Sequence, residues 1–422
     1  MSSAKLKRVI SLVGPISFAV ANFALALALQ RVGGANDFGT FAFLQVLIAT
    51  GMSVSSGLFG SPLIFQISRA GADAVRVLST FSRVNLLFSA IAGIAAGLVI
   101  LMLGSGALAS GLGGIAVFLS LMRWFIRSAY LARNSLSEAK SSDLVYSILT
   151  VAALGGLLLS ATLSLESAIA VQLLVTLASL SPYLSTLSGT FVASEAGPLS
   201  EYRKSLRDQG AWALLAAGAT NLTANIHAYA VTFIFGAAAF APLALGTMIF
   251  RPLGVILTGL VQFERPRMAR SIASGSVEAV EKDVRFVQHL VALAWLGNAL
   301  VAAFLVIVIP GEVGKDGYDI ATLQWAVALV AVLVLVRGLR EPKTAALQGC
   351  GAFKVIARAS VSSAAVAIVA VAISIAAFPG NPATALLGAL LGEAVNFSLI
   401  RIAYRREIAA KTIDFQKVPA SQ

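Results

Sequence analysis

The chain has 422 residues, of which 58% are hydrophobic and only 12% are charged. Ordinary soluble domains carry about 25% charged residues, so this composition excludes a water-soluble fold of this length. The formal net charge of +12 suits either a nucleic-acid partner or a membrane topology, and the placement of the basic residues decides between them.

Apolar stretches long enough to cross a bilayer recur along the whole chain. A membrane-spanning helix needs about 20 mostly apolar residues, because lipid offers no hydrogen-bond partners to the backbone. We therefore expect an all-α integral membrane protein with about twelve transmembrane helices. They are predicted at 9–29, 40–61, 84–104, 108–130, 143–163, 167–188, 210–233, 238–261, 286–309, 321–340, 357–378 and 383–404.

The basic residues test this order of helices independently. With the N-terminus in the cytoplasm, all but two of the 31 lysines and arginines fall on the inner side, and only Arg31 and Lys315 remain outside. Lysine and arginine accumulate in short cytoplasmic loops. The pattern predicts that both termini are cytoplasmic, and it assigns the positive charge to topology, so that we expect no nucleic-acid partner.

A weak internal repeat predicts two pseudo-symmetric six-helix bundles. Arg123 and Lys140 in the first half recur at the same spacing as Arg337 and Lys354 in the second half. Parallel repeats of this kind place the substrate between halves that rock about it. The expected division is a first bundle, a cytoplasmic linker, a second bundle and a cytoplasmic tail, at 1–192, 193–209, 210–404 and 405–422.

Ionisable residues inside predicted helices are the first candidates for a binding site, because a charge in the bilayer centre is costly and usually faces a cavity or a partner. Glu393 is the deepest. It is either a proton or cation site, a counter-ion to a cavity arginine, or a carboxyl bonded to a neighbouring helix. Arg251 precedes Pro252 in the predicted eighth helix and is the best candidate for a ligand contact.

Further polar side chains lie on the same predicted helices. Arg123 in the fourth helix and Arg337 in the tenth suit bidentate phosphate binding, or they mark the inner interface as the charge rule requires. Asn221 and Asn225 are four residues apart on one face of the seventh helix. These amides are predicted either to hydrogen-bond sugar hydroxyls or to hold helices together.

Motifs of enzymes and of metal sites are missing from the sequence. There is no Walker A loop, no zinc-type histidine spacing and no nucleophile with a matching base,. The single cysteine, Cys350, excludes a cysteine-based metal site, and neither His227 nor His289 belongs to a ligand pattern,. We therefore expect no enzymatic activity, no metal and no cofactor, while a coupling ion, H+ or Na+, stays an open choice.

Short motifs resemble a known transporter family. They are Gln30-Arg31-Val32-Gly33, Phe38-Gly39-Thr40-Phe41-Ala42-Phe43-Leu44-Gln45, Arg251-Pro252 with Pro266 closing that helix, Leu347-Gln348-Gly349 to Lys354, and Leu387-Gly388-Ala389 to Glu393. Together they resemble the polysaccharide-repeat flippases (the Wzx type) of the multidrug/oligosaccharidyl-lipid/polysaccharide exporter superfamily. The chain lacks the buried arginines in the first two helices that the related lipid II flippases have.

The resemblance implies a central cationic cavity in the bacterial inner membrane. The implied substrate is an undecaprenyl-diphosphate-linked oligosaccharide repeat unit, flipped by alternating access for O-antigen, capsule or exopolysaccharide biosynthesis. By matched position, Arg31 would lie at an outer gate, Arg251 would contact the diphosphate or sugar, and Glu393 would be a polar cavity site. The implied partners are this lipid-linked oligosaccharide and membrane lipids, with the polysaccharide polymerase and the chain-length machinery as further candidates.

Two other functions stay open. A cation-coupled multidrug exporter of the same superfamily would be expected to have acidic rather than basic cavity residues. A membrane-embedded saccharide polymerase or ligase would need a sizeable outer loop, and the longest predicted outer loop covers only residues 310–320.

Overall fold

The computed structural model describes residues 3–60, 62–63, 66–67, 74–133, 136–183, 197–273, 276–314 and 318–417. This part of the chain is helical and contains no strand, as expected for an all-α membrane protein. The start of the predicted linker, 193–196, and the outer residue Lys315 lie outside the described residues. The chain forms two compact units, and both α10 and α11 contribute residues to each.

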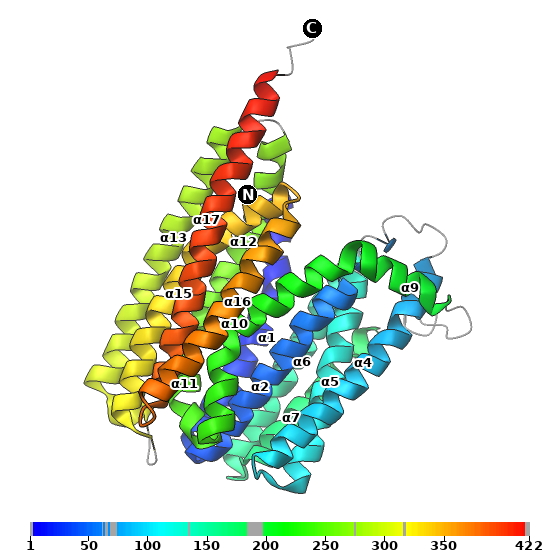
Figure 1. The fold of residues 1–422 in the computed structure, drawn as a ribbon. Helices are drawn as coiled ribbons and strands as arrows, with labels where there is room; N and C mark the ends of the chain where they lie inside the picture. The colour runs from blue at the N-terminus through cyan, green and yellow to red at the C-terminus, as the bar shows by residue number, and fades with distance from the viewer. Residues whose placement is uncertain are drawn as a thin grey trace. The chain divides into compact units, whose positions relative to one another are not determined.

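Unit 1 comprises residues 1–218 and 232–241. Its long helices are α1 (Ser3–Val32), α2 (Ala35–Ser55), α4 (Ala74–Met102), α5 (Gly106–Ala132), α6 (Leu136–Leu159) and α7 (Leu165–Ala178). Shorter elements are η1 (Ser56–Gly60), η3 (Ser181–Tyr183), α9 (Leu199–Ser205), η5 (Leu206–Gly210) and the ends of α10 (Ala211–Phe235). Within this unit α1 packs against α6, and α5 packs against α4 and α7 (Figure 1).

Small residues allow a close helix contact in unit 1, between α4 and α5. A Cβ added to Gly93 would lie 2.7 Å from the carbonyl oxygen of Gly114. Helices in lipid gain stability from such close backbone approach, because burial of apolar surface gives little driving force there. The core beside this contact is aromatic, and the Phe59 ring lies 5.8 Å from Phe125 and 5.9 Å from Tyr202.

Unit 2 comprises residues 219–231 and 242–422. It contains the middle of α10 and the end of α11 (Ala237–Ile249). The remaining elements are α12 (Arg251–Ala273), α13 (Val277–Ala303), η6 (Phe304–Val308), α14 (Pro310–Val313), α15 (Ile320–Gly349), α16 (Phe353–Ala377), η7 (Pro382–Thr384) and α17 (Ala385–Lys417). Here α17 packs against α15 and α16, and α13 packs against α12 and α15.

The contact between α16 and α17 again depends on a small residue. A Cβ added to Gly392 would lie 2.6 Å from the Cβ of Ala367 and 3.1 Å from the carbonyl oxygen of Ser363. In contrast to unit 1, the core of unit 2 is mostly aliphatic, with Val284, Val287 and Val291 among its buried residues. Both units therefore bring helices to close range at glycine but fill their interiors differently.

Ten helices in the described part are long and apolar enough to cross a membrane. Each of the twelve predicted segments overlaps a helix, but α10 and the α11–α12 pair are not among the ten. α10 is long enough, but Asn221, Asn225 and His227 lower its hydropathy. The count of twelve crossings, with both termini in the cytoplasm, therefore stays a prediction.

The predicted continuous helix at 238–261 is wrong. α11 ends at Ile249 and a new helix, α12, begins at Arg251. Pro252 explains the break, because proline lacks the backbone N–H that a continuous helix needs but is tolerated in a first turn. Pro266 does not close this segment either, because α12 continues to Ala273.

Candidate functional site

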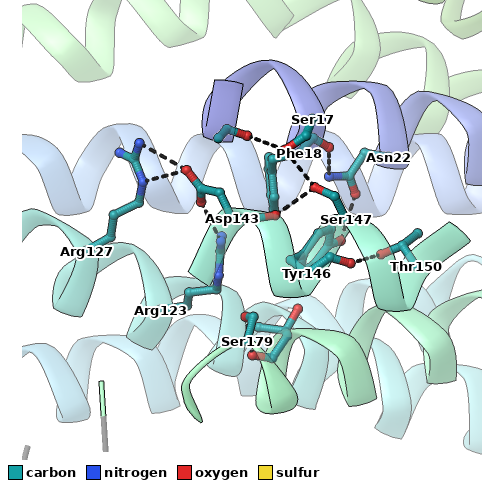
Figure 2. Close-up of polar contacts among 12 residues, drawn as sticks. Ser17, Phe18, Asn22, Arg123, Arg127, Asp143, Tyr146, Ser147, Thr150 and Ser179 are labelled. Carbon is teal, nitrogen blue, oxygen red and sulfur yellow. Dashed lines mark hydrogen bonds and ion pairs between the residues drawn. The ribbon is translucent and has the colours of Figure 1, made fainter. Parts of the chain in front are cut away.

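A buried ion-pair cluster joins α5 to α6 in unit 1. Arg123 donates from Nη2 to Oδ1 of Asp143 at 2.6 Å, and Arg127 donates from Nη2 to Oδ2 at 3.3 Å (Figure 2). The side chains of Arg123 and Asp143 are only 5% and 3% exposed. Arg123 and Arg127 are four residues apart and therefore lie on one face of α5, so that a single carboxylate serves both.

Aromatic rings complete the surroundings of Arg123. Its guanidinium carbon lies 4.8 Å from the ring centroid of Phe18 and 5.2 Å from that of Tyr146. The negative face of an aromatic ring attracts a guanidinium, more strongly where water is excluded. Gly14 leaves room for the acid, since a Cβ there would lie 3.0 Å from Oδ2 of Asp143. α1 thus forms one wall of the cluster.

Hydrogen bonds hold this wall in place. Tyr146 donates its hydroxyl to Oδ1 of Asn22 at 2.9 Å, and Ser147 donates its hydroxyl to Ser17 at 3.1 Å (Figure 2). Both contacts connect α6 to α1. The rings and the carboxylate around Arg123 are therefore fixed by interhelical polar contacts, which is the arrangement that a preformed charged site requires.

A second ion-pair cluster joins α15 to α17 in unit 2. Arg337 donates from Nε to Oε1 of Glu393 at 2.9 Å, and Nη1 of Arg340 lies 3.7 Å from Oε2 of the same carboxylate. Arg340 also donates from Nη2 to Oε1 of Glu341 at 2.6 Å. Glu393 is 0% exposed and Arg340 is 3% exposed. This geometry fits both a counter-ion to arginines and a carboxyl bonded to a neighbouring helix, and a role of Glu393 as a proton or cation site stays a prediction.

Several polar atoms around the second cluster lack a hydrogen-bond partner within the described residues. They include Oε2 of Glu393, Nη2 of Arg337, Nδ1 of His227 and both side-chain amide atoms of Asn396. Arg337 also interacts electrostatically with His227. Buried polar groups in native proteins are nearly always paired with protein or water, so this cluster has the capacity to bind water or a polar ligand.

The middle of α10 reaches this region through hydroxyl groups. The hydroxyls of Thr223 and Ser363 lie 3.1 Å apart, and Ser363 donates to the carbonyl oxygen of Gly392 at 3.0 Å. The chain of contacts therefore runs from α10 through α16 to the residue before Glu393. Asn225 bonds within its own helix, donating from Nδ2 to the carbonyl oxygen of Asn221 at 3.1 Å.

The remaining predicted site residues lie on α1, α10 and α12. Arg251 is half-buried at the first position of α12, and Arg31 is exposed in the last turn of α1. Asn221 and Asn225 are half-buried on α10. The structure therefore brings Arg337 to Glu393 and Arg123 to a partner of its own.

Asp143 is the central residue that the sequence analysis missed. It lies in α6 at the edge of a predicted apolar segment, where an acid is costly unless it is paired,. The sequence held one indication of this pairing: two arginines four residues apart lie on the helix that precedes the one with Asp143. Because helix pairing cannot be read from one sequence, the partner became evident only in the structure.

The two clusters differ in the chemistry that they can perform. The first carries two arginines and one carboxylate, which leaves positive charge for an anionic group. The second carries two arginines and two carboxylates, together with unpartnered polar atoms suited to water, a proton or a hydroxyl-rich ligand. Within the described residues no group of histidine, cysteine or acidic side chains has the arrangement of a metal site.

Comparison with known proteins gives structural likeness alone. No protein-family model and no curated protein matches the chain. A multidrug resistance MATE family transporter of the MOP superfamily, in an inward-facing conformation, matches with a TM-score of 0.70 and 14% identity, over 98% of this chain and 100% of that one.

Two further solved structures agree. A eukaryotic MATE transporter has a TM-score of 0.64 at 12% identity, over 98% of both chains. A MOP superfamily transporter from Pyrococcus furiosus, described by a reversed polarity of its binding pocket, has a TM-score of 0.63 at 14% identity, over 96% of this chain and 95% of that one. This protein is a multi-pass membrane protein with the fold of MATE transporters of the MOP superfamily.

Proposed function

We propose that this protein is a secondary transporter of the MOP type in a bacterial inner membrane. Two six-helix bundles, 1–192 and 210–404, would rock about a central substrate, with both termini in the cytoplasm. The support is the shared fold with transporters over nearly the whole chain, together with ten apolar helices in its described part. A coupling ion, H+ or Na+, would drive the cycle, since the sequence has no nucleotide-binding loop.

The proposed substrate is an undecaprenyl-diphosphate-linked oligosaccharide. The observation that carries this choice is the pairing of the buried acids: each of the four buried carboxylates in the described part lies within ion-pair distance of an arginine. They are Asp143, Glu264, Asp283 and Glu393. An acid that already neutralises an arginine is a poor receptor for a cationic drug. Arginine exceeds acid at Asp143, which favours a diphosphate there, whereas Glu264 and Asp283 share the single Arg267,.

A cation-coupled multidrug exporter is the second candidate. The structural neighbours favour it, because the first of them is described as a multidrug resistance transporter. The transporter from Pyrococcus furiosus favours the first candidate, because reversed pocket polarity is offered there as a sign of different function. The two candidates differ in the charge of the substrate, which an experiment can measure directly.

The test compares two cargoes in vesicles that contain the purified full chain. One set carries a fluorescent undecaprenyl-diphosphate saccharide, and the other carries a cationic dye under an imposed H+ or Na+ gradient. Protein-dependent flipping of the lipid-linked saccharide without dye efflux supports the first candidate. Dye efflux without flipping supports the second candidate. If the protein shows neither flipping nor dye efflux, the result contradicts the proposed transporter function.

Arg251 tests the predicted ligand contact. Replacement of Arg251 by Ala should reduce saccharide flipping about tenfold or more, because one charge-assisted contact to phosphate is lost. The matched control is Arg358→Ala, which removes an exposed arginine in the first turns of α16. Equal flipping by the two variants at equal protein levels would remove Arg251 from the binding site.

A further inference from the structure

A cavity of about 390 Å³ opens to the surface of unit 2 between α13, α15 and α17. Its size falls within the range of small-molecule sites, about 300–1,000 Å³. Three cations line it: Lys343 on α15, and Arg401 and Arg405 on α17. None of its lining residues belongs to the cluster of Arg337, Arg340 and Glu393.

The cations of this cavity have no acidic partner in the described part of the chain. The only carboxylate in the lining is Glu281, which already lies 3.9 Å from Nη2 of Arg285. Arg401 and Arg405 are four residues apart on one face of α17. Like charges at this spacing repel one another. An anion bound in the cavity would offset this repulsion between Arg401 and Arg405.

Two further groups complete the cavity. Tyr404 is 7% exposed, and its hydroxyl is buried without a hydrogen-bond partner in the described residues. The Lys343 ammonium lies 5.5 Å from the ring centroid of Phe397, which holds it at the wall without neutralising it,. On the α13 side, Gln288 donates from Nε2 to the carbonyl oxygen of Leu339 at 2.7 Å, which ties α13 to α15.

The composition of the lining specifies the ligand chemistry. Arginine forks and a hydroxyl donor match the oxygens of a phosphate group. Basic pockets between transmembrane helices on the cytoplasmic side bind anionic lipid headgroups. Basic residues that only orient a membrane protein need neither a shared cavity nor an unpartnered buried hydroxyl at its wall.

We propose that this cavity is a phosphate-binding site, in which Lys343, Arg401, Arg405 and the Tyr404 hydroxyl hold the phosphate group of an anionic lipid headgroup or of a free phosphate. The site lies within unit 2 and does not depend on what the protein transports. Its bound anion would neutralise the three cations and tie α13, α15 and α17 together at this end.

The experiment uses the purified full chain and native mass spectrometry. The protein is exposed to equal amounts of phosphatidylglycerol and phosphatidylcholine and, in a separate arm, to inorganic phosphate. Phosphatidylglycerol should be retained in preference to phosphatidylcholine. The Arg401→Gln/Arg405→Gln double variant should weaken retention about 25-fold, at about fivefold per cation. The matched control is Arg406→Gln, which removes an exposed arginine of α17 that does not line the cavity.

A gentler variant covers the case in which the double variant does not fold. Tyr404→Phe removes one oxygen and should weaken retention about threefold to tenfold. Displacement of the lipid by millimolar inorganic phosphate would identify free phosphate as the ligand, and retention in its presence would identify the headgroup. Equal retention of the two lipids, or equal weakening by Arg406→Gln and the cavity variants, would overturn the proposal.

Discussion

Unit 1 and unit 2 each pair one buried and one half-buried arginine with a buried acid, but they neutralise the arginines in different ways. In unit 1, Asp143 alone serves Arg123 and Arg127, and two aromatic rings enclose Arg123. In unit 2, Arg337 and Arg340 share Glu393, and Arg340 has a second acid in Glu341. One acid for two arginines makes the first cluster dependent on a single residue. In the second cluster Arg340 has an alternative acid, and polar atoms stay unpartnered within the described residues.

The sharpest test of this difference is Asp143→Asn. The change leaves two arginines without a counter-ion, and an uncompensated buried charge costs about 3–5 kcal/mol. We expect a fall of that size in the free energy of unfolding, measured by thermal or denaturant unfolding in detergent. The control is Glu201→Gln, which removes the acid of the exposed Arg76–Glu201 pair and should cost no more than about 1 kcal/mol,. Equal costs would contradict the single-acid interpretation.

The glycine contacts test what the units share. Gly93→Leu in unit 1 and Gly392→Leu in unit 2 should each destabilise the protein by about 1–3 kcal/mol or more, because the new side chain meets backbone or Cβ atoms of the neighbouring helix,. Gly156→Leu is the matched control, since nothing lies within 4 Å of a Cβ added there. A neutral Gly93→Leu variant would show that α4 and α5 are not held by close approach.

Glu393→Gln tests the redundancy of unit 2. The amide oxygen can still accept the hydrogen bond from Arg337, and Arg340 keeps Glu341, so we expect a loss of only about 1–2 kcal/mol,. The transport rate should fall even where the free energy of unfolding changes little, because the unpartnered atoms beside Glu393 lose their charged neighbour. A loss as large as that of Asp143→Asn, under the same unfolding assay, would abolish the distinction between the two clusters.

The smallest expected loss of unfolding free energy concerns the N-terminal cap of α15 at Asp319. α15 is the helix that carries Arg337 and Arg340. Asp319 accepts hydrogen bonds from the backbone N–H groups of Ala321 and Thr322 and from the Thr322 hydroxyl. The Thr322 hydroxyl, followed by these N–H groups, lowers the pKa of Asp319 below its ordinary value of 3.8. Asp319→Ala should cost about 0.5–1 kcal/mol at neutral pH.

The sign of the pH effect follows from this lowered pKa. The carboxylate contributes its stability in full above the unfolded-state pKa of 3.8 and loses it as the pH falls through the lower folded-state value,. The difference in unfolding free energy between the wild type and Asp319→Ala should therefore shrink below about pH 4. A difference that stays constant down to pH 2 would show that the cap does not depend on the charge.

The positions of the helices could be predicted because they follow from local composition. Twenty apolar residues in a row have one stable form in lipid, so every predicted segment overlaps a helix,. The break before Arg251 was the exception, because an Arg-Pro pair inside an apolar stretch is compatible with a kink or with two helices. The choice between these forms depends on whether the neighbouring helices supply hydrogen-bond partners for the backbone groups freed at the break.

The candidate site was predictable only in part, and for a different reason. Arg123, Arg337 and Glu393 stood out because a charge in an apolar segment is costly wherever it lies. Their partners did not stand out. Asp143 is only 20 residues from Arg123 in the sequence but belongs to another helix, and a single sequence does not specify how the two helices pack. The cavity beside Lys343, Arg401 and Arg405 was likewise hidden, because its basic residues match the general inward bias of positive charge.

The amino-acid sequence alone indicates a helical membrane protein and the places of its apolar helices, because the bilayer requires a long apolar stretch of each segment separately. The tertiary structure decided which arginine meets which carboxylate, that α11 and α12 are separate helices, and that three cations of α15 and α17 share one cavity. These properties depend on pairs of residues in different helices. These interactions form only when the helices pack against one another, so only the tertiary structure shows them.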